Sequence, residues 1–125
     1  MNTGLLIAND CDTKRSFLLA HQATKLNLPA MMVTNNDARK FPNMKQGSER
    51  QNFQFDRILC DVPCSGDGTL RKNSGLWKSF HCHMGHQNHK LQLDILLRGL
   101  QLLKKDGRLV YSTCSFNPIE NEAVV

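Results

Sequence analysis

The chain has 125 residues, of which 40% are hydrophobic and 22% are charged, a composition typical of a globular domain or part of one and not of a disordered segment. Its apolar runs are far shorter than the roughly 20 residues that a membrane-spanning helix needs, and its start, MNTGLLIAND, lacks the pattern of a secretory signal. Sixteen Lys and Arg against eleven Asp and Glu give a net charge of +5, which permits a polyanionic partner without requiring one.

The first part of the chain predicts a strand, a helix, a second strand and a loop. Gly4–Asn9 has the length of a short buried strand. Asp12 is placed to cap a helix that runs to about Leu26. Ala30–Thr34 is a second apolar run, and the polar residues 35–54 predict a long loop with room for a helical turn.

The second part predicts, in order, a strand, an irregular segment, a helix, a strand and the start of another helix. These are Phe55–Cys60, residues 61–75, Lys90–Lys105, Arg108–Ser112 and a helix capped by Asn117 with Pro118 and Glu120 in its first turn. Leucines spaced at i, i+3, i+4 and i+7 indicate the first of these helices, and Asp106-Gly107 is expected to close it.

This alternation of strands and helices predicts an α/β fold with a doubly wound, mainly parallel sheet. Ligands of such sheets bind at the carboxyl ends of the strands. The residues that follow the four strands are therefore the candidate site: Asp10, Asp37, residues 61–68 and residues 113–118.

The usual opening of a nucleotide-binding α/β unit has no counterpart in this sequence. Such a unit begins with a strand and a Gly-rich turn, and an acidic residue follows about 20 residues later. Asp10 fits the acidic role, but the nine residues before it contain one glycine and leave no room for the first strand. We therefore expect residues 1–125 to be part of a longer domain that is truncated at both ends.

Two of the five cysteines stand at the ends of predicted strands. Cys64 lies in the segment DVPCSGDGT, which follows a hydrophobic strand directly, and Cys114 lies between a strand and the helix expected at Asn117. The odd number of cysteines and the missing export signal favour reduced thiols over a disulfide framework. A helix N-terminus next to Cys114 would favour its thiolate, and both thiols are expected to face one crevice.

These two segments resemble the signature motifs of the Nop/Sun family of RNA cytosine-C5 methyltransferases. The matching residues are Asp61–Gly66 (DVPCSG) and Ser112–Glu120 (STCSFNPIE). Residues 61–73 together with Trp77, and residues 8–15 (ANDCDTKR), are similar to the eukaryotic branch that acts on tRNA. The resemblance extends from Gly4 to Val125 and implies a partial Rossmann-like fold that binds S-adenosylmethionine, with the first strand and the Gly-rich donor loop missing.

The resemblance implies a role for each candidate residue. Cys114 would be the nucleophile, and Cys64 would be the thiol that resolves the adduct. Asp10 would accept hydrogen bonds from the donor's ribose hydroxyls, Asp37 would lie near the adenine, and Arg15 would be a weaker donor contact. Asp61 would lie beside the donor's methionine end and the target base. The chemistry suits these residue types, because a thiolate that adds to cytosine C6 makes C5 nucleophilic enough to accept a methyl group. The target cytosine must also leave its stack to reach the pocket.

The remaining cysteines and the histidines have simpler interpretations. Cys60, inside a strand, and Cys11 are expected to be inert core thiols. Five potential metal ligands lie close together at His81, Cys82, His83, His86 and His89. Their spacing matches no standard zinc pattern, so polar surface is favoured over a metal site and no metal is expected.

Positive charge is concentrated in residues 68–105, where seven Lys and Arg face one acid, Asp94. Arg71, Lys72 and Lys78 follow the Cys64 segment and have Trp77 beside them for stacking, so they are the candidate RNA-binding residues. For the basic residues from Arg98 to Lys105, the alternative to RNA binding is an ordinary solvated helix face.

The expected function is the transfer of a methyl group from S-adenosylmethionine to cytosine C5 in RNA, with tRNA as the favoured substrate, no membrane partner and a nuclear or nucleolar location. Two alternatives remain open. One is the same chemistry on rRNA, and the other is a truncated, non-catalytic isoform that binds RNA or a protein partner. A nicotinamide-dependent enzyme is disfavoured, because it leaves the paired thiols without a role.

Overall fold

The computed structural model describes residues 4–45 and 52–125. The chain divides into two compact units, one up to Phe41 and the other from Pro42 onward. Among the described residues, no helix combines the length and the apolar character that crossing a membrane requires.

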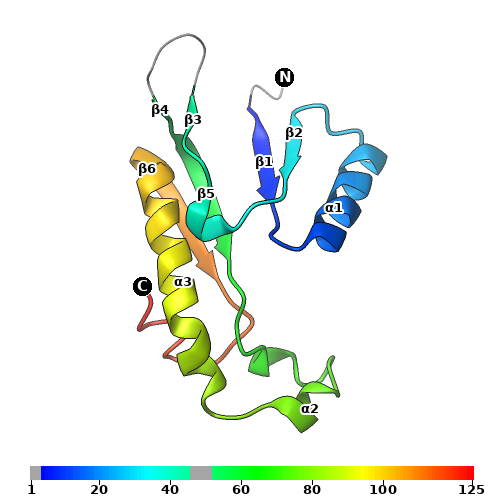
Figure 1. Ribbon diagram of the computed structural model, residues 1–125, viewed down its shortest axis with the longest axis vertical. Helices are drawn as coiled ribbons and strands as arrows, with labels where there is room; N and C mark the ends of the chain where they lie inside the picture. The colour runs from blue at the N-terminus through cyan, green and yellow to red at the C-terminus, as the bar shows by residue number, and fades with distance from the viewer. Residues whose placement is uncertain (1–3, 46–51) are drawn as a thin grey trace. The chain divides into compact units, whose positions relative to one another are not determined.

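The first unit is a strand, a helix and a parallel second strand, as predicted. The strand β1 is Leu6–Asn9, the helix α1 is Thr13–Lys25 and the strand β2 is Met31–Thr34 (Figure 1). The two strands pair in parallel from Leu6 opposite Met31 to Asn9 opposite Thr34. Asp12 caps α1 by accepting a hydrogen bond of 2.8 Å from the backbone N–H of Arg15, and the 3-10 helix η1 follows at Ala38–Lys40.

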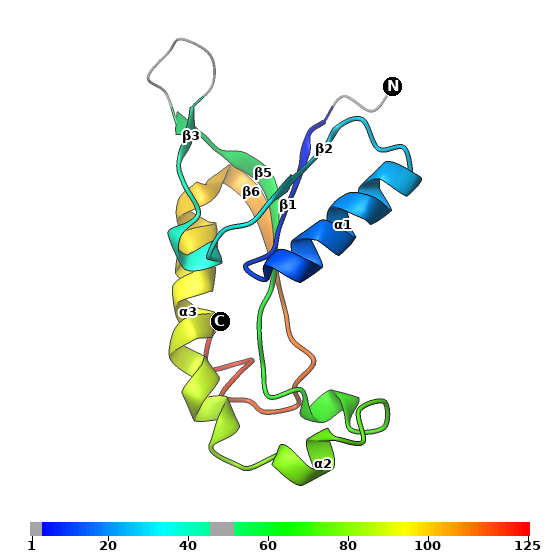
Figure 2. The same cartoon turned by 45° about the vertical axis from the view of Figure 1, so that its right-hand side comes forward.

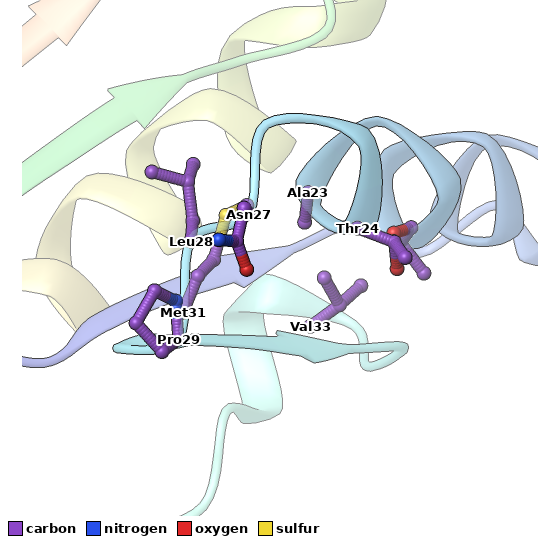
Figure 3. A pocket seen from close by; sticks show the side chains of 8 residues that line it. Ala23, Thr24, Asn27, Leu28, Pro29, Met31 and Val33 are labelled. Atoms are coloured by element: carbon purple, nitrogen blue, oxygen red, sulfur yellow. The ribbon is translucent and has the colours of Figure 1, made fainter.

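A shallow apolar hollow lies between α1 and β2 within this unit. Figure 3 shows Ala23 of α1 and Val33 of β2 facing it, with Leu28 and Met31 at one end. None of the eight described residues that line the hollow is charged.

The second unit is built around a pair of parallel strands and one long helix. The strand β5 is Phe55–Asp61, the helix α3 is Met84–Leu102 and the strand β6 is Leu103–Ser112. Figures 1 and 2 both show α3 running alongside β5 and β6. Gly99 permits this close packing, because a Cβ atom there would lie 3.0 Å from Cys60 Sγ and 3.0 Å from Leu109 Cδ1.

Two shorter helices connect β5 to α3, and a small hairpin-like pair precedes β5. The 3-10 helix η2 is Asp67–Thr69 and the helix α2 is Leu76–Ser79. The strands β3 (Met44–Lys45) and β4 (Asn52–Phe53) pair antiparallel. The predicted loop over residues 35–54 is therefore wrong at these two short strands and correct in its helical turn, η1, while its residues 46–51 lie outside the described part.

The boundary between α3 and β6 differs from the predicted one. The helix ends at Leu102 and the strand begins at Leu103, whereas the leucine pattern predicted a helix up to Lys105. Asp106, with φ +64°, and Gly107 lie inside the strand segment. The pairing of β6 with β5 is irregular there, between Phe55 and Arg57, so the Asp-Gly pair marks an irregularity in the strand and not the end of the helix.

The expected helix at Asn117 is replaced by consecutive turns. The backbone N–H of Glu120 donates to Asn117 O at 3.0 Å, and that of Ala123 donates to Pro118 O at 2.9 Å. Asn117 Oδ1 accepts from the N–H of Ile119, as a turn-forming Asn does. Glu120 does not close a capping box, because it points toward Ser65, Ser115 and the helix α3.

The observed architecture is thus mixed α/β with two parallel strand pairs, which confirms the predicted fold class, and each sheet among the described residues has two strands. Parallel strands β5 and β6 end at the same edge. Their pairing reaches from Arg57 opposite Arg108 to Asp61 opposite Ser112, so the segments that contain Cys64 and Cys114 leave the sheet side by side.

Candidate active site

The two thiols at the ends of β5 and β6 are in direct contact. Beyond the last strand pair, the N–H of Val62 still donates to Ser112 O at 3.1 Å. Cys64 Sγ and Cys114 Sγ are 3.1 Å apart, and the N–H of Cys114 lies 3.3 Å from Cys64 Sγ. Both cysteines are free, and Cys114 is exposed. The parallel strand register thus brings together the two thiols that the sequence placed 50 residues apart.

Hydrogen bonds between the two loops, one of them to the Asp67 side chain, join the segments that carry the thiols. The N–H of Gly68 donates to Cys114 O at 3.0 Å, and the N–H of Phe116 donates to Asp67 Oδ1 at 2.9 Å. A Cβ atom at Gly68 would lie 2.7 Å from Cys114 O, which no side chain tolerates without a shift of the backbone. Gly66 adopts φ +74°, a conformation that glycine accepts at no steric cost.

The environment of Cys114 favours the protonated thiol. The hydrogen bond with Cys64 is the main cause that raises its pKa to about 11, followed by partial burial and the charge of Cys64. The nearby carboxylate of Asp61 acts in the same direction. The sequence had predicted a thiolate stabilised by a helix N-terminus, and this prediction is wrong because turns replace that helix.

Removing the neighbouring thiol should make Cys114 more reactive. In Cys64→Ala, the pKa of Cys114 should fall toward its usual range, because its main cause of elevation is gone. At pH 8 a larger fraction of Cys114 is then thiolate in the variant than in the wild type. Alkylation of Cys114 by iodoacetamide should therefore be about threefold to tenfold faster in the variant. Peptide mass spectrometry measures the rate at Cys114, with Cys82→Ala as the control. An equal or slower rate in Cys64→Ala would contradict the assigned cause.

A buried polar network, which sequence reasoning missed, connects both loops to α3. Gln92 and Glu120 are each 0% exposed. Gln92 Nε2 donates to Pro63 O at 2.9 Å and to Glu120 Oε1 at 3.0 Å. Glu120 also accepts hydrogen bonds from Ser65 and Ser115. The available signal was a Gln at helical spacing from Leu96 and Gly99, together with a Glu in a cysteine motif.

The predicted acidic residues fall in both units. Asp61 is exposed at the end of β5 in the second unit, beside the thiols. Asp10 follows β1 directly in the first unit, where its Oδ1 accepts from the N–H of Asp12 at 2.8 Å and from Arg15 Nη2 at 2.9 Å. Arg15 is therefore paired with Asp10 within the first unit.

Asp37 is engaged by a neighbour in its own turn. It caps η1, and its two carboxylate oxygens accept from the guanidinium of Arg39, with the closest contact at 2.6 Å. This side-chain hydrogen bond is the main cause that lowers the pKa of Asp37. The residue thus remains ionised over the neutral pH range and already has a cationic partner.

The three candidate RNA-binding residues are all exposed and follow the Cys64 loop in the chain. Arg71 and Lys72 follow η2, and Lys78 lies on α2. Trp77, on the same short helix, is 68% exposed and donates from Nε1 to Leu70 O at 3.2 Å. Leu76 lies close to Gly66, since a Cβ atom there would be 3.6 Å from Leu76 Cδ2 and 3.9 Å from Cys114 Sγ. The start of α2 is therefore within reach of the thiols.

The other cysteines and the histidines do not form a comparable cluster among the described residues. Cys60 is buried, which raises its pKa, as expected of a core thiol. Cys11 is exposed, so its expected place in the core is wrong; it lies in the turn between β1 and α1. His89 Nδ1 lies 2.7 Å from Ile119 O. Within the described residues, no three His, Cys, Asp or Glu side chains converge as ligands of a metal ion.

Comparison with known proteins identifies the family of this chain. The model of the 16S rRNA methyltransferase RsmB/F family matches residues 1–125. The chain belongs to this family. Among curated family members, the chain is 55% identical over 127 residues to the multisite-specific tRNA:(cytosine-C(5))-methyltransferase of Saccharomyces cerevisiae, covering 98% of the chain and 19% of the relative. It is 50% identical to the tRNA (cytosine(34)-C(5))-methyltransferase of Drosophila melanogaster, with 98% and 17% covered.

Solved structures of the family have the same fold. The crystal structure of NSun6 from Pyrococcus horikoshii with SFG superposes with a TM-score of 0.81 at 28% identity, over 98% of this chain and 29% of that chain. The chain therefore spans about a fifth of the length of these curated relatives and under a third of this structural neighbour. The resemblance seen in the sequence and the Rossmann-like α/β fold are both confirmed.

Proposed function

We propose that the protein containing this chain transfers a methyl group from S-adenosylmethionine to C5 of cytosine in RNA, with tRNA as the substrate. The observation that carries this proposal is the contact of Cys64 with Cys114 at 3.1 Å, at the carboxyl ends of two parallel strands. Relatives at 50–55% identity are named tRNA cytosine-C5 methyltransferases, which supports both the reaction and the substrate class.

The thiol of Cys114 is the proposed nucleophile. Its sulfur adds to cytosine C6 after it loses its proton, and the electron pair moved to C5 then attacks the methyl group. Because the pKa of Cys114 is raised, the free site stores the protonated form. The thiolate form of Cys64, whose sulfur is 3.1 Å away, is the proposed acceptor of that proton. The carboxyl group of Asp61 is proposed to stabilise the base at N3.

The second thiol is proposed to act in release. After methylation, C5 carries both the methyl group and a proton, and a base must remove this proton before the C6–S bond breaks. Breaking this bond returns the sulfur electron pair to Cys114. Cys64 is in place to assist this step, since its sulfur contacts that of Cys114. Two adjacent thiols thus separate attack from release.

The residues of the first unit fit part of a donor-binding site. Bound S-adenosylmethionine supplies the electrophilic methyl group, and SFG, present in a related structure, is its analogue. Asp10, a carboxylate directly after a strand with a 25% exposed side chain, fits the role of acceptor for ribose hydroxyls. Asp37 fits less well because Arg39 takes both its oxygens, so we assign it only a place beside the adenine.

We further infer that residues 1–125 are part of a methyltransferase catalytic domain, and that Arg71, Lys72 and Lys78 bind the RNA backbone. Their exposure on η2–α2 and the neighbouring exposed Trp77 support this assignment. The target cytosine would leave its stack to reach Cys114. A nuclear or nucleolar location is the corresponding proposal for a tRNA-modifying protein of this kind.

The same chemistry on rRNA is the second candidate, favoured by the family description, which names 16S rRNA methyltransferases. The deciding experiment incubates the full-length protein and labelled S-adenosylmethionine with unmodified tRNA or unmodified rRNA. Mass spectrometry of the digested RNA should find 5-methylcytosine in tRNA. Label in rRNA alone would favour the second candidate, and RNA binding without any methylation would favour a non-catalytic binding protein.

A further inference from the structure

A buried carboxylate lies beneath the thiol pair. Of the charged residues that the structure describes, Glu120 alone is fully buried, with 0% of its surface exposed. Burying a carboxylate is costly unless hydrogen bonds compensate for the lost water. The contacts of Glu120 therefore indicate what this charge does in the fold.

Each carboxylate oxygen of Glu120 has several donors. Oε1 accepts from the backbone N–H of Ser65 at 2.9 Å, from Gln92 Nε2 at 3.0 Å and from Asn88 Nδ2 at 3.3 Å. Oε2 accepts from the hydroxyls of Ser65 and Ser115, the latter at 2.6 Å. Burial would raise the pKa of Glu120, but these hydrogen bonds together outweigh it and lower the pKa. The group is thus an ionised acceptor for donors from three segments.

Two of the donors, Ser65 and Ser115, are the immediate neighbours of the two thiols in the chain. Ser65 follows Cys64, and Ser115 follows Cys114. Gln92, itself bonded to Glu120, donates to the carbonyl of Pro63, the residue before Cys64. We propose that Glu120 is a positioning residue that holds Cys64 and Cys114 at the spacing needed for attack and release. For the reaction itself, this inference rests on the proposed function.

The hydrogen-bond pattern separates a positioning role from a role of the charge. The donors to Oε1 are N–H groups, which cannot accept, whereas both partners of Oε2 are hydroxyls, which can donate or accept. A glutamine with its oxygen in the place of Oε1 and its NH₂ group in the place of Oε2 satisfies both sides. Glu120→Gln should therefore preserve the positions of the thiols, and Glu120→Ala should not.

The kinetic test uses the full-length protein with tRNA. Glu120→Ala should lower kcat on the order of a hundredfold, the effect of misplacing reacting groups by about 1 Å. KM for tRNA should change little, because the basic residues of the η2–α2 segment are untouched. The kcat of Glu120→Gln should stay within about threefold of the wild-type kcat. Glu122→Ala, a neighbouring and exposed glutamate, is the matched control.

A second measurement reports the thiol spacing without methylation. Diamide takes up the two hydrogens of a thiol pair and becomes a hydrazine, while the sulfurs join as a disulfide. Peptide mass spectrometry follows Cys64–Cys114 disulfide formation in protein free of RNA. Glu120→Ala should slow it by roughly tenfold or more, and Glu120→Gln should form it at nearly the wild-type rate.

The outcomes distinguish this inference from the proposed function. Slower disulfide formation in Glu120→Ala, with a wild-type protein that lacks methyltransferase activity, would keep the positioning role and refute the proposed reaction. Wild-type rates in Glu120→Ala in both measurements would overturn the inference. If kcat falls equally in Glu120→Gln and Glu120→Ala while Glu120→Gln keeps the wild-type disulfide rate, the positioning inference is also overturned. The negative charge of Glu120 would then be what the reaction needs.

A milder variant covers a failure of Glu120→Ala to fold. Ser65→Ala removes one hydroxyl donor and leaves the backbone N–H of Ser65 on Oε1. It should lower both kcat and the disulfide rate several-fold while circular dichroism stays unchanged. The positioning role is contradicted if folded Ser65→Ala keeps the wild-type kcat and disulfide rate, and Glu120→Gln and any folded Glu120→Ala keep full activity.

Discussion

Cys114→Ala in the full-length protein should abolish methylation and leave no covalent protein–RNA complex. The reason is that the sulfur needed for addition to cytosine C6 is missing, and Cys64, held by the loop after β5, is not expected to replace it. Loss of a covalent nucleophile typically costs at least a thousandfold in rate. Methyl transfer from labelled donor and denaturing gel electrophoresis of the RNA-bound protein are the two measurements.

Cys64→Ala has a different expected outcome. Attack and methyl transfer should still occur, but release should fail, so an RNA-linked species accumulates that survives denaturation. Its amount should approach one per active site, and turnover should stop after the first methyl transfer. The double variant should form no complex, because trapping requires the attack to happen first.

The opposite pattern would reverse the two roles. A complex in Cys114→Ala and none in Cys64→Ala would make Cys64 the nucleophile, and the geometry is compatible with that exchange since the two sulfurs are neighbours. Cys82→Ala, which alters an exposed thiol outside both loops, is the control and should behave as the wild type.

Replacing Arg71, Lys72 and Lys78 together by glutamine should weaken RNA binding by roughly tenfold to a hundredfold at low salt. The physical reason is the loss of up to three phosphate contacts and of the counterion release that accompanies them. Fluorescence anisotropy with labelled tRNA at several salt concentrations gives both affinity and slope. The slope of log K against log salt should become shallower by about 2.

A charge-matched control separates local contacts from overall charge. Lys14, Lys25 and Lys105 are exposed and lie outside the η2–α2 segment, and their triple glutamine variant removes the same number of charges. This control variant should lower the affinity for tRNA much less than the replacement of Arg71, Lys72 and Lys78 does. Equal affinity and equal salt slope in the first triple variant and the wild type would make Arg71, Lys72 and Lys78 ordinary solvated residues.

The sequence by itself determined the class of fold and the two cysteine segments of the candidate site. Local patterns were sufficient for β1, α1, β2 and β5, because apolar runs of strand length and the Asp12 cap are encoded within a few residues. The two cysteine motifs were recognisable for the same reason, since each is a continuous stretch after a strand.

Local patterns were insufficient where distant residues decide the conformation. The leucine periodicity extended past Leu102, but pairing with Phe55 draws Leu103 into β6. The start of a helix at Asn117 was a sound local expectation, yet Glu120 accepts hydrogen bonds from Ser65, Ser115 and Gln92 and does not close a capping box. The cost of burying its charge requires all of these donors at once.

Only the tertiary structure decided the protonation preference of Cys114. The sequence suggested a helix dipole and hence a thiolate, whereas the register of β5 and β6 places a second thiol against Cys114 and raises its pKa to about 11. A pKa depends on the groups within a few ångströms, and here the decisive group lies 50 residues away in the chain. The identity of both thiols was therefore readable in the sequence, but their contact and its consequence for reactivity were not.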